Sequence, residues 1–391
     1  MTDAQRIYLD NAATSWPKPD TVYDAVQHAM RTLGAPAGRG VYHEANEVER
    51  LVGDARRRIA AFIGAKHSNH IIFTFNGTDS LNMALFGVLR PGDHVVTSVV
   101  EHNSVLRPLR QLQTEHEISV TRVRCDSTGI INPDDIRAAI RPDSRLIAIT
   151  HASNVTGAIQ PVEEIGRIAA NSDVLFLVDA AQSLGHIPVD VHQMNAQLVA
   201  APGHKGLLGP LGTGILYIAE SVEDQISPLR FGGTGTQSDE DRQPDSMPDK
   251  FESGNLNVPA IAGLAAGVEF LENQGALEVR QHKRTLTEQL LDGLRSIDSV
   301  EVYGPSDIEK QVGVVSFKLA GLAPQELAML LDTTYSIQVR SGMHCAPMMH
   351  QALGTADDGG TVRINPGVFT TAADLHTAIQ AIAEIAAAVN V

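Results

Sequence analysis

The chain has 391 residues, of which 43% are hydrophobic, and its formal net charge is −16. This length is too great for one small core and predicts two domains, or one large domain with an appendage. Acidic residues are spread along the whole chain, which argues against nucleic acid or an anionic membrane as the main partner, because both require a basic face.

Cys125 and Cys345 are the only cysteines, so the chain has no disulfide framework. The first residues, MTDAQRIYLDNAATSWPKPD, lack the basic and apolar regions of a secretory signal. No apolar run approaches the length needed to span a membrane. We therefore expect a soluble, cytoplasmic protein without a membrane partner.

The first part of the chain combines an extended arm with helices. Residues 1–19 read as the arm, and helical patterns cover residues 20–33 and 44–62. From residue 70, short apolar runs alternate with helical segments; the runs are HIIFTF, HVVTSVV, ISVTRVR, RLIAIT, VLFLVDA, QLVAA and GILYIA. This alternation predicts βαβ units and a mostly parallel sheet, whose strands are apolar throughout because both faces are covered.

Residues 228–257 are rich in Gly, Pro, Asp and Ser and predict a long loop, which in a compact domain tends to be functional or disordered. A helical pattern then covers residues 259–297, interrupted at Gly275. The rest predicts a smaller α+β unit with helices near 324–331 and 372–388.

These patterns divide the chain into two predicted domains. The large domain covers residues 20–258, and the small domain combines residues 1–19 with residues 259–391. In sheets of this kind, ligands bind beyond the carboxyl ends of the strands, so the residues that follow each apolar run are candidates for a site.

The loop after HIIFTF contains Gly77, Thr78 and Asp79 and leads directly into a helix. Backbone N–H groups and a hydroxyl at such a helix start can bind phosphate, although an ordinary N-cap is an equal alternative. No P-loop or complete dinucleotide-binding glycine fingerprint is present, which weighs against ATP and NAD.

Four more polar residues follow apolar runs. His102 follows HVVTSVV and Asn154 follows RLIAIT; alone, each is typical of a structural hydrogen bond or a turn. Asp179 ends a buried strand, so it requires a cationic or N–H partner. Lys205 follows QLVAA within GHKGLLGPLGTG, where by itself it reads as a surface lysine in a glycine-rich turn.

Together these strand ends supply a phosphate cradle, a flat side chain that stacks, an anion for a ring nitrogen and an amine for an aldehyde. Pyridoxal 5'-phosphate requires this set of contacts, including the lysine and the aspartate. The sequence therefore predicts pyridoxal phosphate as the cofactor.

Several longer motifs are specific enough to indicate a protein family. They are YLDNAATSWPKP, FNGTDSLN, EHNSVLRPL, SNVTG, VDAAQS, PGHKG, SGNLNVPAI, RSGMHCAP and TVRINPG. With them the chain resembles, over nearly its whole length, the class V aminotransferase branch of the fold-type I pyridoxal phosphate enzymes, and within it the cysteine desulfurase and selenocysteine lyase family. The resemblance implies an α/β fold: a large domain with a mostly parallel seven-stranded sheet between helices, and a smaller α+β C-terminal domain.

By this resemblance, Lys205 carries the cofactor as a Schiff base and Asp179 pairs with the pyridine nitrogen. His102 stacks on the ring, and Gln182 contacts its phenolic oxygen. The remaining predicted cofactor residues hold the phosphate and are Gly77, Thr78, Asp79 and His204.

The resemblance also implies a substrate site. Asn154 and Arg363 match positions that bind the amino acid, and Arg363 grips its carboxylate with two parallel bonds. Cys345 matches the nucleophile that forms a persulfide. We place Arg340 in the same site and expect positive charge on Arg340 and His344 to favour the Cys345 thiolate.

At four positions the chain departs from the family pattern, which leaves details of the phosphate and substrate pockets open. These positions are Asp79, Pro202, Asn255 and Thr370. His344, Cys345 and His350 have the residue types of a metal site, but no fourth ligand is near in sequence, so we predict no metal.

The predicted function is conversion of L-cysteine to L-alanine, with sulfur transferred to Cys345. The resemblance implies a homodimer in which the loop at 228–257 reaches across, a possible sulfur-acceptor protein, and a role in sulfur metabolism such as iron–sulfur cluster assembly. Alternatives are a selenocysteine lyase, another class V enzyme (aminotransferase, epimerase or C–S lyase), or an inactive scaffold.

Overall fold

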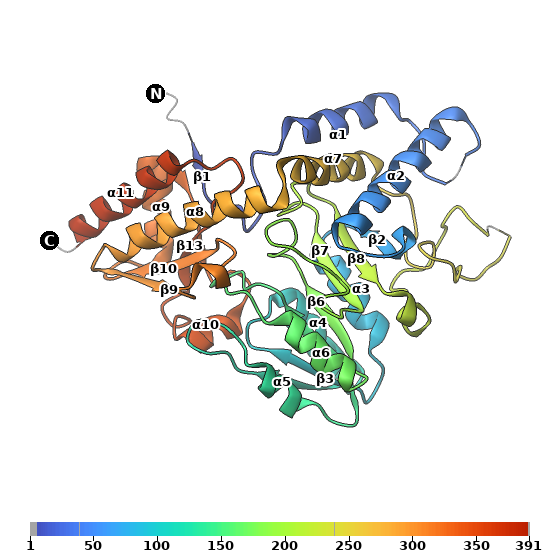
Figure 1. Cartoon of the computed structure of the whole chain (residues 1–391), viewed down its shortest axis with the longest axis horizontal. Coiled ribbons are helices and arrows are strands. Elements are labelled where there is room, and N and C mark those ends of the chain that lie inside the picture. The colour runs from blue at the N-terminus through green and yellow to red at the C-terminus, as the bar shows by residue number, and fades with distance from the viewer. Residues whose placement is uncertain (1–5, 39, 238, 390–391) are drawn as a thin grey trace.

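The computed structural model describes residues 6–38, 40–237 and 239–389. Figure 1 shows a large α/β part, which extends from α1 (Asp20–Thr32) to α7 (Val258–Gln274), and a smaller part at the C-terminal end, with the long helix α8 (Ala276–Arg295) running into it. No helix within the described ranges is both long and apolar enough to cross a membrane.

The large part is built on one seven-stranded sheet with the order β2-β8-β7-β6-β5-β3-β4. Its strands are β2 (Ile71–Thr74), β3 (His94–Ser98), β4 (Ser119–Val123), β5 (Ser144–Thr150), β6 (Leu175–Asp179), β7 (Leu198–Pro202) and β8 (Gly214–Ile218). β8 runs antiparallel to both of its neighbours, and the other adjacent pairs are parallel. The predicted mostly parallel seven-stranded sheet is confirmed.

Helices cover both faces of this sheet, because successive strand residues point in opposite directions. Ile147 and Ile149 of β5 join a core with α2, α6 and α7, whereas Leu146 and Ala148 join a second core with α3 and α4. The α-helices that precede α7 are α1 (Asp20–Thr32), α2 (His43–Phe62), α3 (Gly77–Val88), α4 (Asn103–Glu115), α5 (Pro133–Ala139) and α6 (Val162–Asn171).

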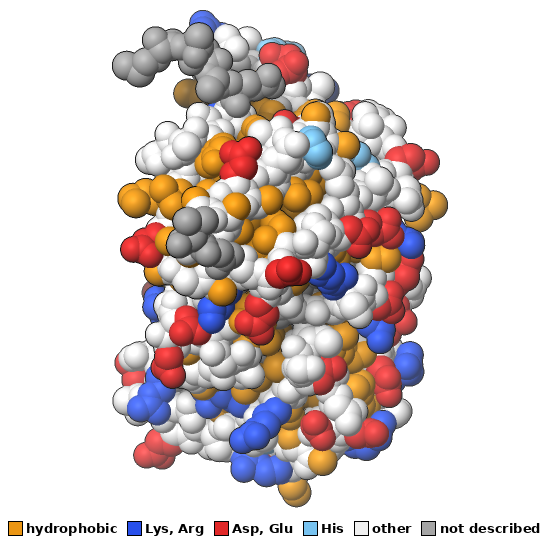
Figure 2. Space-filling model, turned by 90° about the vertical axis from the view of Figure 1, so that its left-hand side faces the viewer, with side chains coloured by type: hydrophobic (Ala, Val, Ile, Leu, Met, Phe, Trp, Pro, Cys, Tyr) orange, Lys and Arg blue, Asp and Glu red, His pale blue; other side chains and the backbone are white. Residues whose placement is uncertain are grey.

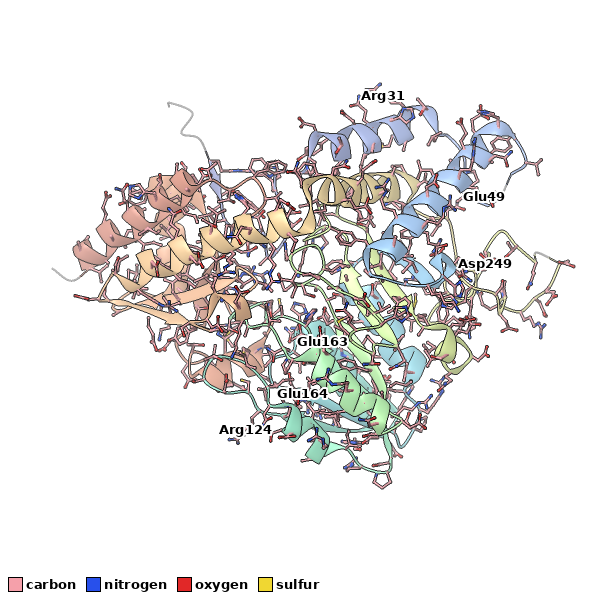
Figure 3. All side chains as sticks on the ribbon, in the orientation of Figure 1. Arg31, Glu49, Arg124, Glu163, Glu164 and Asp249 are labelled. Carbon is pink, nitrogen blue, oxygen red and sulfur yellow. The ribbon has the colours of Figure 1, made fainter. Side chains whose placement is uncertain are left out.

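Local sequence explains where these helices begin. α4 starts at Asn103, because the His102 side chain caps it by accepting a bond from the Ser104 N–H. The first turn of α6 contains Glu163 and Glu164, whose exposed carboxylates (Figure 3) suit the positive end of the helix dipole.

The smaller part follows two consecutive helices, α7 (Val258–Gln274) and α8 (Ala276–Arg295), which are separated at Gly275 as predicted. Gly275 has a φ of 85°, a value that favours glycine, so the chain turns there. α7 belongs to the core of the large sheet, while α8 contributes Leu286, Leu290 and Leu294 to a separate core. The domain division at residue 258 therefore stays a prediction.

A four-stranded antiparallel sheet with the order β12-β13-β10-β9 forms this separate core with the helices α8, α9 and α11. The strands and helices of the smaller part that follow α8 include β9 (Val300–Tyr303), β10 (Val315–Leu319), β12 (Arg340–Gly342), β13 (Thr361–Ile364), α9 (Pro324–Tyr335), α10 (Pro347–Leu353) and α11 (Ala372–Val389). The N-terminal arm joins this part, since β1 (Ile7–Tyr8) pairs with β11 (Ile337–Gln338). Figure 2 shows acidic and basic side chains interspersed on this side of the molecule.

The segment 228–257 is a loop without helix or strand among its described residues, and ion pairs hold it at both ends. Arg230 pairs with Asp79 of α3 at 2.7 Å, and Thr236 bonds Asp249 (Figure 3) within the loop at 2.9 Å. Near its end, Glu252 accepts two bonds from Arg56 of α2, at 2.7 and 2.8 Å, and one from the Phe73 N–H at 2.6 Å.

The Arg56–Glu252 pair generates a stability prediction. Both side chains are nearly buried, with 9% and 5% exposure, so Glu252→Ala leaves an unpaired guanidinium inside the protein. We expect the free energy of unfolding to fall by about 3–5 kcal/mol, measured by urea denaturation.

Glu240→Ala is the matched control, because it removes a carboxylate from an exposed pair with Arg242 in the same loop. The control should leave the unfolding midpoint near that of the unaltered protein. Equal midpoints for both variants would contradict a structural role for the buried pair.

Candidate active site

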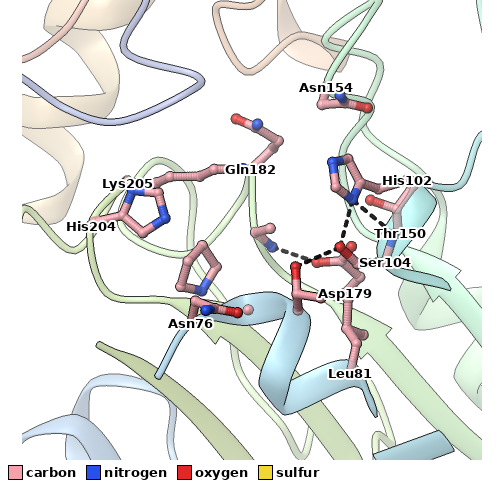
Figure 4. Close-up of a pocket in the computed structure, with 14 residues that line it drawn as sticks. Asn76, Leu81, His102, Ser104, Thr150, Asn154, Asp179, Gln182, His204 and Lys205 are labelled. Carbon is pink, nitrogen blue, oxygen red and sulfur yellow. Dashed lines mark hydrogen bonds between the residues drawn. The ribbon is translucent and has the colours of Figure 1, made fainter. Parts of the chain in front are cut away.

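A pocket lies where the parallel strands of the large sheet end, and the loops after β2, β3, β5, β6 and β7 all line it. Figure 4 shows side chains from these loops arranged around the same space. The lining residues are Asn76, Gly77, Thr78, Leu81, His102, Ser104, Thr150, Asn154, Asp179, Ala181, Gln182, Pro202, His204 and Lys205. Seven of the predicted cofactor residues are thus brought together, and Asp79 is not among the lining residues.

Asp179 and Lys205 are the two opposite charges of the pocket. Asp179 is 3% exposed and accepts a bond from the Ala181 N–H at 2.9 Å. Burial raises the pKa of Asp179, whereas the Ala181 N–H and the charge of Lys205 act in the opposite direction. Burial lowers the pKa of Lys205 to about 8, and Asp179 opposes that change, so the amine is partly neutral near physiological pH.

The start of α3 forms one wall. Asn76 caps the helix by accepting a bond from the Asp79 N–H at 2.9 Å. A Cβ atom at Gly77 would lie 3.0 Å from Cδ of Pro202, so the Pro202 ring packs directly on this turn and the position favours glycine. Pro202, one of the departures from the family pattern, therefore shapes the floor of the predicted phosphate cradle.

Asp79 faces away from the pocket. Its carboxylate accepts a bond from the Phe75 N–H at 2.9 Å and pairs with Arg230 at 2.7 Å. Arg230 therefore neutralises an acid that stands next to the predicted phosphate cradle. Asn255 and Thr370 are the remaining departures from the family pattern. Asn255 lines a neighbouring pocket with Arg230 and Phe75, and the Thr370 hydroxyl accepts a bond from the Gly367 N–H at 2.8 Å.

His102 is held in one orientation by the residues around it. Its Nδ1 accepts a bond from the Ser104 N–H at 3.0 Å and lies 2.8 Å from the Ser104 hydroxyl, which also contacts the Thr78 hydroxyl at 2.8 Å. Burial, followed by the charge of Lys205, lowers the pKa of His102 to about 3. The ring is therefore neutral, which suits stacking on another ring.

Two further predicted residues keep unpaired buried atoms. Gln182 donates an amide hydrogen to the Ala12 carbonyl at 2.9 Å, while its Oε1 is buried without a partner among the described residues. His204 has an unpaired Nδ1, and burial lowers its pKa to about 4. Buried polar atoms without partners are uncommon in folded proteins, so both side chains have hydrogen-bonding capacity for a ligand.

The smaller part of the chain brings Cys345 beside this pocket, in the short loop between β12 and α10. Three predicted residues, Cys345, Arg340 and Arg363, are not among the residues that line the pocket. The Cys345 carbonyl accepts a bond from the Asn103 N–H at 2.7 Å, next to His102, and the Asn154 amide donates to the His344 carbonyl at 2.5 Å. His344 and Cys345 have φ values of 46° and 60°, a left-handed conformation that is unusual for non-glycine residues. The loop is thus held in a tight turn against the pocket wall.

The charges around Cys345 differ from the prediction in one respect. Arg340 Nη2 lies 3.5 Å from Cys345 Sγ, as the expected positive field requires. His344 is 2% exposed, and burial lowers its pKa to about 2. The expectation of a positive charge on His344 is therefore wrong, because a neutral imidazole bonded to Thr361 cannot supply it.

Arg363 lies in β13 and is 1% exposed. Its guanidinium donates to the Asn154 carbonyl at 3.0 Å and to Asp10 Oδ1 at 2.7 Å. The charges of Arg363 and Arg340 both lower the pKa of Lys205, which reflects their closeness to the amine.

Sequence reasoning assigned no role to Glu101, Ser104 or Thr150. Glu101 is fully buried, accepts bonds from the Ser98 hydroxyl at 2.6 Å and the Thr150 N–H at 2.9 Å, and joins the ends of β3 and β5. Burial raises the pKa of Glu101 to about 8. In the sequence, a role for Glu101 was indicated by its position beside His102, directly after an apolar strand.

Comparison with known proteins supports a common origin over nearly the whole chain. The family model described as "Aminotransferase class-V" matches residues 7–377. A probable cysteine desulfurase from Methanothermobacter thermautotrophicus is 38% identical over 97% of this chain and 94% of its own length. A cysteine desulfurase from Haloferax volcanii is 33% identical over 90% of this chain and 83% of its own length.

Solved structures agree with the fold. The apo structure of a cysteine desulfurase from Thermococcus onnurineus has a TM-score of 0.92 and 35% identity, covering 98% of this chain and 95% of that one. A cysteine desulfurase from Escherichia coli has a TM-score of 0.88 and 28% identity, covering 99% and 96%. The chain therefore belongs to the class V aminotransferase family of enzymes, in which its relatives over nearly their full length are named cysteine desulfurases.

Proposed function

We propose that this protein is a pyridoxal phosphate-dependent cysteine desulfurase, which converts L-cysteine to L-alanine and carries the sulfur on Cys345. The observation that carries the proposal is that an amine with a lowered pKa, Lys205, and a buried carboxyl group, Asp179, line one pocket. The loop that carries Cys345, whose Sγ contacts Arg340, is bonded to Asn103 beside that pocket. Relatives named cysteine desulfurase support the choice of substrate.

The pocket fits the cofactor. Asp179 has one backbone partner and remains free to pair with a ring nitrogen, and Lys205 lies across the pocket for the aldehyde. The unpaired Nδ1 of His204 and the N–H groups at the start of α3 suit the phosphate, with Arg230 compensating for Asp79. When bound, pyridoxal phosphate supplies an electron-accepting ring that makes the α-proton of an amino acid acidic.

The chain's own residues then carry the remaining steps. Arg363 binds the substrate carboxylate, and Asn154 holds both Arg363 and the cysteine loop in place. Lys205, partly neutral near pH 8, takes the α-proton. The Cys345 thiolate attacks the substrate sulfur: a sulfur–sulfur bond forms, and the substrate carbon–sulfur bond breaks. The released electron pair goes to the β-carbon, which takes up a proton equivalent to the one that the Cys345 thiol lost. Lys205 returns its proton to the α-carbon, and the product leaves as alanine.

Arg340 is the cation beside the attacking sulfur in this proposal, because its guanidinium lies 3.5 Å from Cys345 Sγ. A selenocysteine lyase is the second candidate, since selenium leaves carbon more readily than sulfur and needs less help from a thiolate. The sites of the two enzymes would contain the same residues, so only substrate comparison separates them.

We also propose a homodimer, a sulfur-acceptor protein as a transient partner, and a cytoplasmic location. The homodimer is supported by apolar side chains left exposed on the N-terminal arm, along α1 and in the loop after Lys205; they are Trp16, Tyr23, Met30 and Leu211. Contiguous exposed apolar groups of this kind are typical of protein interfaces.

The proposed role of Cys345 is tested by substitution. Cys345→Ala should reduce sulfide and alanine release from L-cysteine by roughly two orders of magnitude or more, as expected when an attacking group is lost. Cys125→Ala is the matched control, because this other free cysteine lies in a different loop, and its activity should equal that of the unaltered protein.

Equal sulfide release by the two variants would contradict the persulfide role. Rapid alanine release from L-selenocysteine that survives Cys345→Ala, with little release from L-cysteine, would instead favour the lyase.

The pKa of Lys205 gives a second prediction. Because only the neutral amine attacks an aldehyde, the rate at which the cofactor-free protein gains colour with pyridoxal phosphate should rise with pH, with a midpoint near 8. An ordinary lysine would give a midpoint near about 10.4.

Asp179→Asn should move this midpoint to lower pH, since Asp179 raises the pKa of Lys205. Lys205→Ala should give no specific colour at any pH. A midpoint that Asp179→Asn leaves unchanged would show that the two groups are not coupled.

A further inference from the structure

Arg363 is a buried cation, and the site predicted from the sequence included no counter-ion for it. It is among the largest fully buried side chains, and β13 places it between β10 and β12, opposite Ser316 and Arg340. Burial lowers the pKa of Arg363, and the nearby charge of Arg340 adds to this effect. An enclosed guanidinium next to a second cation requires a counter-ion.

Asp10 is that counter-ion, delivered by the N-terminal arm from the other end of the chain. Its Oδ1 accepts a bond from Arg363 Nη2 at 2.7 Å, and its charge raises the pKa of Arg363. The Asp10 side chain is 20% exposed against 1% for Arg363, so the carboxylate lies on the more open side of the pair.

The arm around Asp10 is fixed independently of the ion pair. Asp10 bridges Asn365 in parallel fashion, and the Asn365 N–H donates to the Leu9 carbonyl at 2.8 Å. The Asn11 amide donates to the Asn365 carbonyl at 3.0 Å, and the Tyr8 hydroxyl donates to the Asp10 carbonyl at 3.1 Å. The carboxylate is therefore presented to Arg363 by a rigid segment rather than by a free terminus.

These contacts leave part of Arg363 available. A guanidinium has five N–H donors, and the bonds to Asp10 and to the Asn154 carbonyl use two of them. The Nε atom is buried and has no partner among the residues that the structure describes. Arg363 is thus held from two sides with donors remaining for another acceptor.

We propose that Asp10 is a positioning residue for amino-acid binding: it fixes the Arg363 guanidinium and offsets its charge, so that Arg363 binds an α-carboxylate in one orientation and releases it again. This inference rests on the proposed function, because it assumes an amino acid as the ligand of Arg363. The orientation and the charge offset have opposite effects on affinity, which allows them to be separated.

Two substitutions at Asp10 make this separation. Asp10→Asn keeps an oxygen acceptor for Arg363 Nη2 but removes the negative charge, so a carboxylate ligand should bind more tightly, by roughly three- to tenfold. Asp10→Ala removes the acceptor as well, so the guanidinium loses its orientation and affinity should fall by roughly tenfold or more, the effect of one charged hydrogen bond.

The readout is the absorbance change of the pyridoxal phosphate-loaded protein on titration with L-alanine, which binds without needing any sulfur chemistry. L-Alaninamide is the control ligand, because it has the same amine but no carboxylate, and its affinity should be equal in all three proteins. Asp190→Asn is the control variant, since among the described residues this aspartate's side chain accepts bonds from backbone N–H groups of its own loop. Thermal unfolding of each variant checks that the fold is retained.

With L-cysteine, Asp10→Asn should lower KM and leave kcat nearly unchanged, or lower kcat slightly as alanine leaves more slowly. The inference is overturned if both Asp10 variants bind L-alanine like the unaltered protein, or if both weaken L-alanine and L-alaninamide alike. Failure of the proposed function looks different: the unaltered protein would bind L-alanine but release no sulfide from L-cysteine. An unaltered protein that shows no response to L-alanine would overturn both.

Discussion

The position of the site follows from one constraint, the common carboxyl edge of the parallel strands. Strands buried on both faces have no place for polar side chains along their length, so polar groups gather where the strands end. In this protein Asp179 ends β6, and Lys205 and His102 follow β7 and β3 closely. The Glu101 carboxyl group links the ends of β3 and β5, because it accepts bonds from the Ser98 hydroxyl and the Thr150 N–H. The places of the charged and polar side chains in the pocket are thus determined by where the strands of the sheet end.

A lowered lysine pKa does not by itself identify the reactive amine in this molecule. Burial also lowers the pKa of Lys18 to about 8 and that of Lys283 to about 7. Lys283 contacts His186 at 3.0 Å, and Lys18 donates to the His204 carbonyl at 2.9 Å and to the Ser15 hydroxyl at 2.6 Å. Neither lines the pocket that holds Asp179. What distinguishes Lys205 is its shared pocket with a carboxyl group and a neutral, well-oriented imidazole.

The smaller part of the chain completes the site, and its contribution depends on the N-terminal arm. β13 carries Arg363 and the adjoining loop carries Cys345, while the arm returns to the same place to supply Asp10. Asn154 connects the two parts, because its carbonyl accepts from Arg363 and its amide donates to the His344 carbonyl. A shift of the smaller part would therefore move the proposed carboxylate-binding group and the proposed nucleophile together.

Sequence alone predicted the features that depend on local pattern. Continuous apolar runs located the strands, the break at Gly275 was visible, and the residues after each run located the pocket. It could not predict properties that depend on packing across the chain. The neutral state of His344 results from burial against Thr361, and the pairing of Asp79 with Arg230 depends on where a long loop returns. The ion pair of Asp10 could not be predicted for the same reason, since its partner Arg363 lies near the other end of the sequence.

The central claim is that Lys205 carries pyridoxal phosphate in this pocket. The direct measurement is to load the protein with the cofactor, reduce it with borohydride to make the carbon–nitrogen bond permanent, and locate the modified peptide by mass spectrometry. The account predicts modification at Lys205 alone, lost in Lys205→Ala. Modification at Lys18 or Lys283 instead, or scattered over surface lysines, would contradict it.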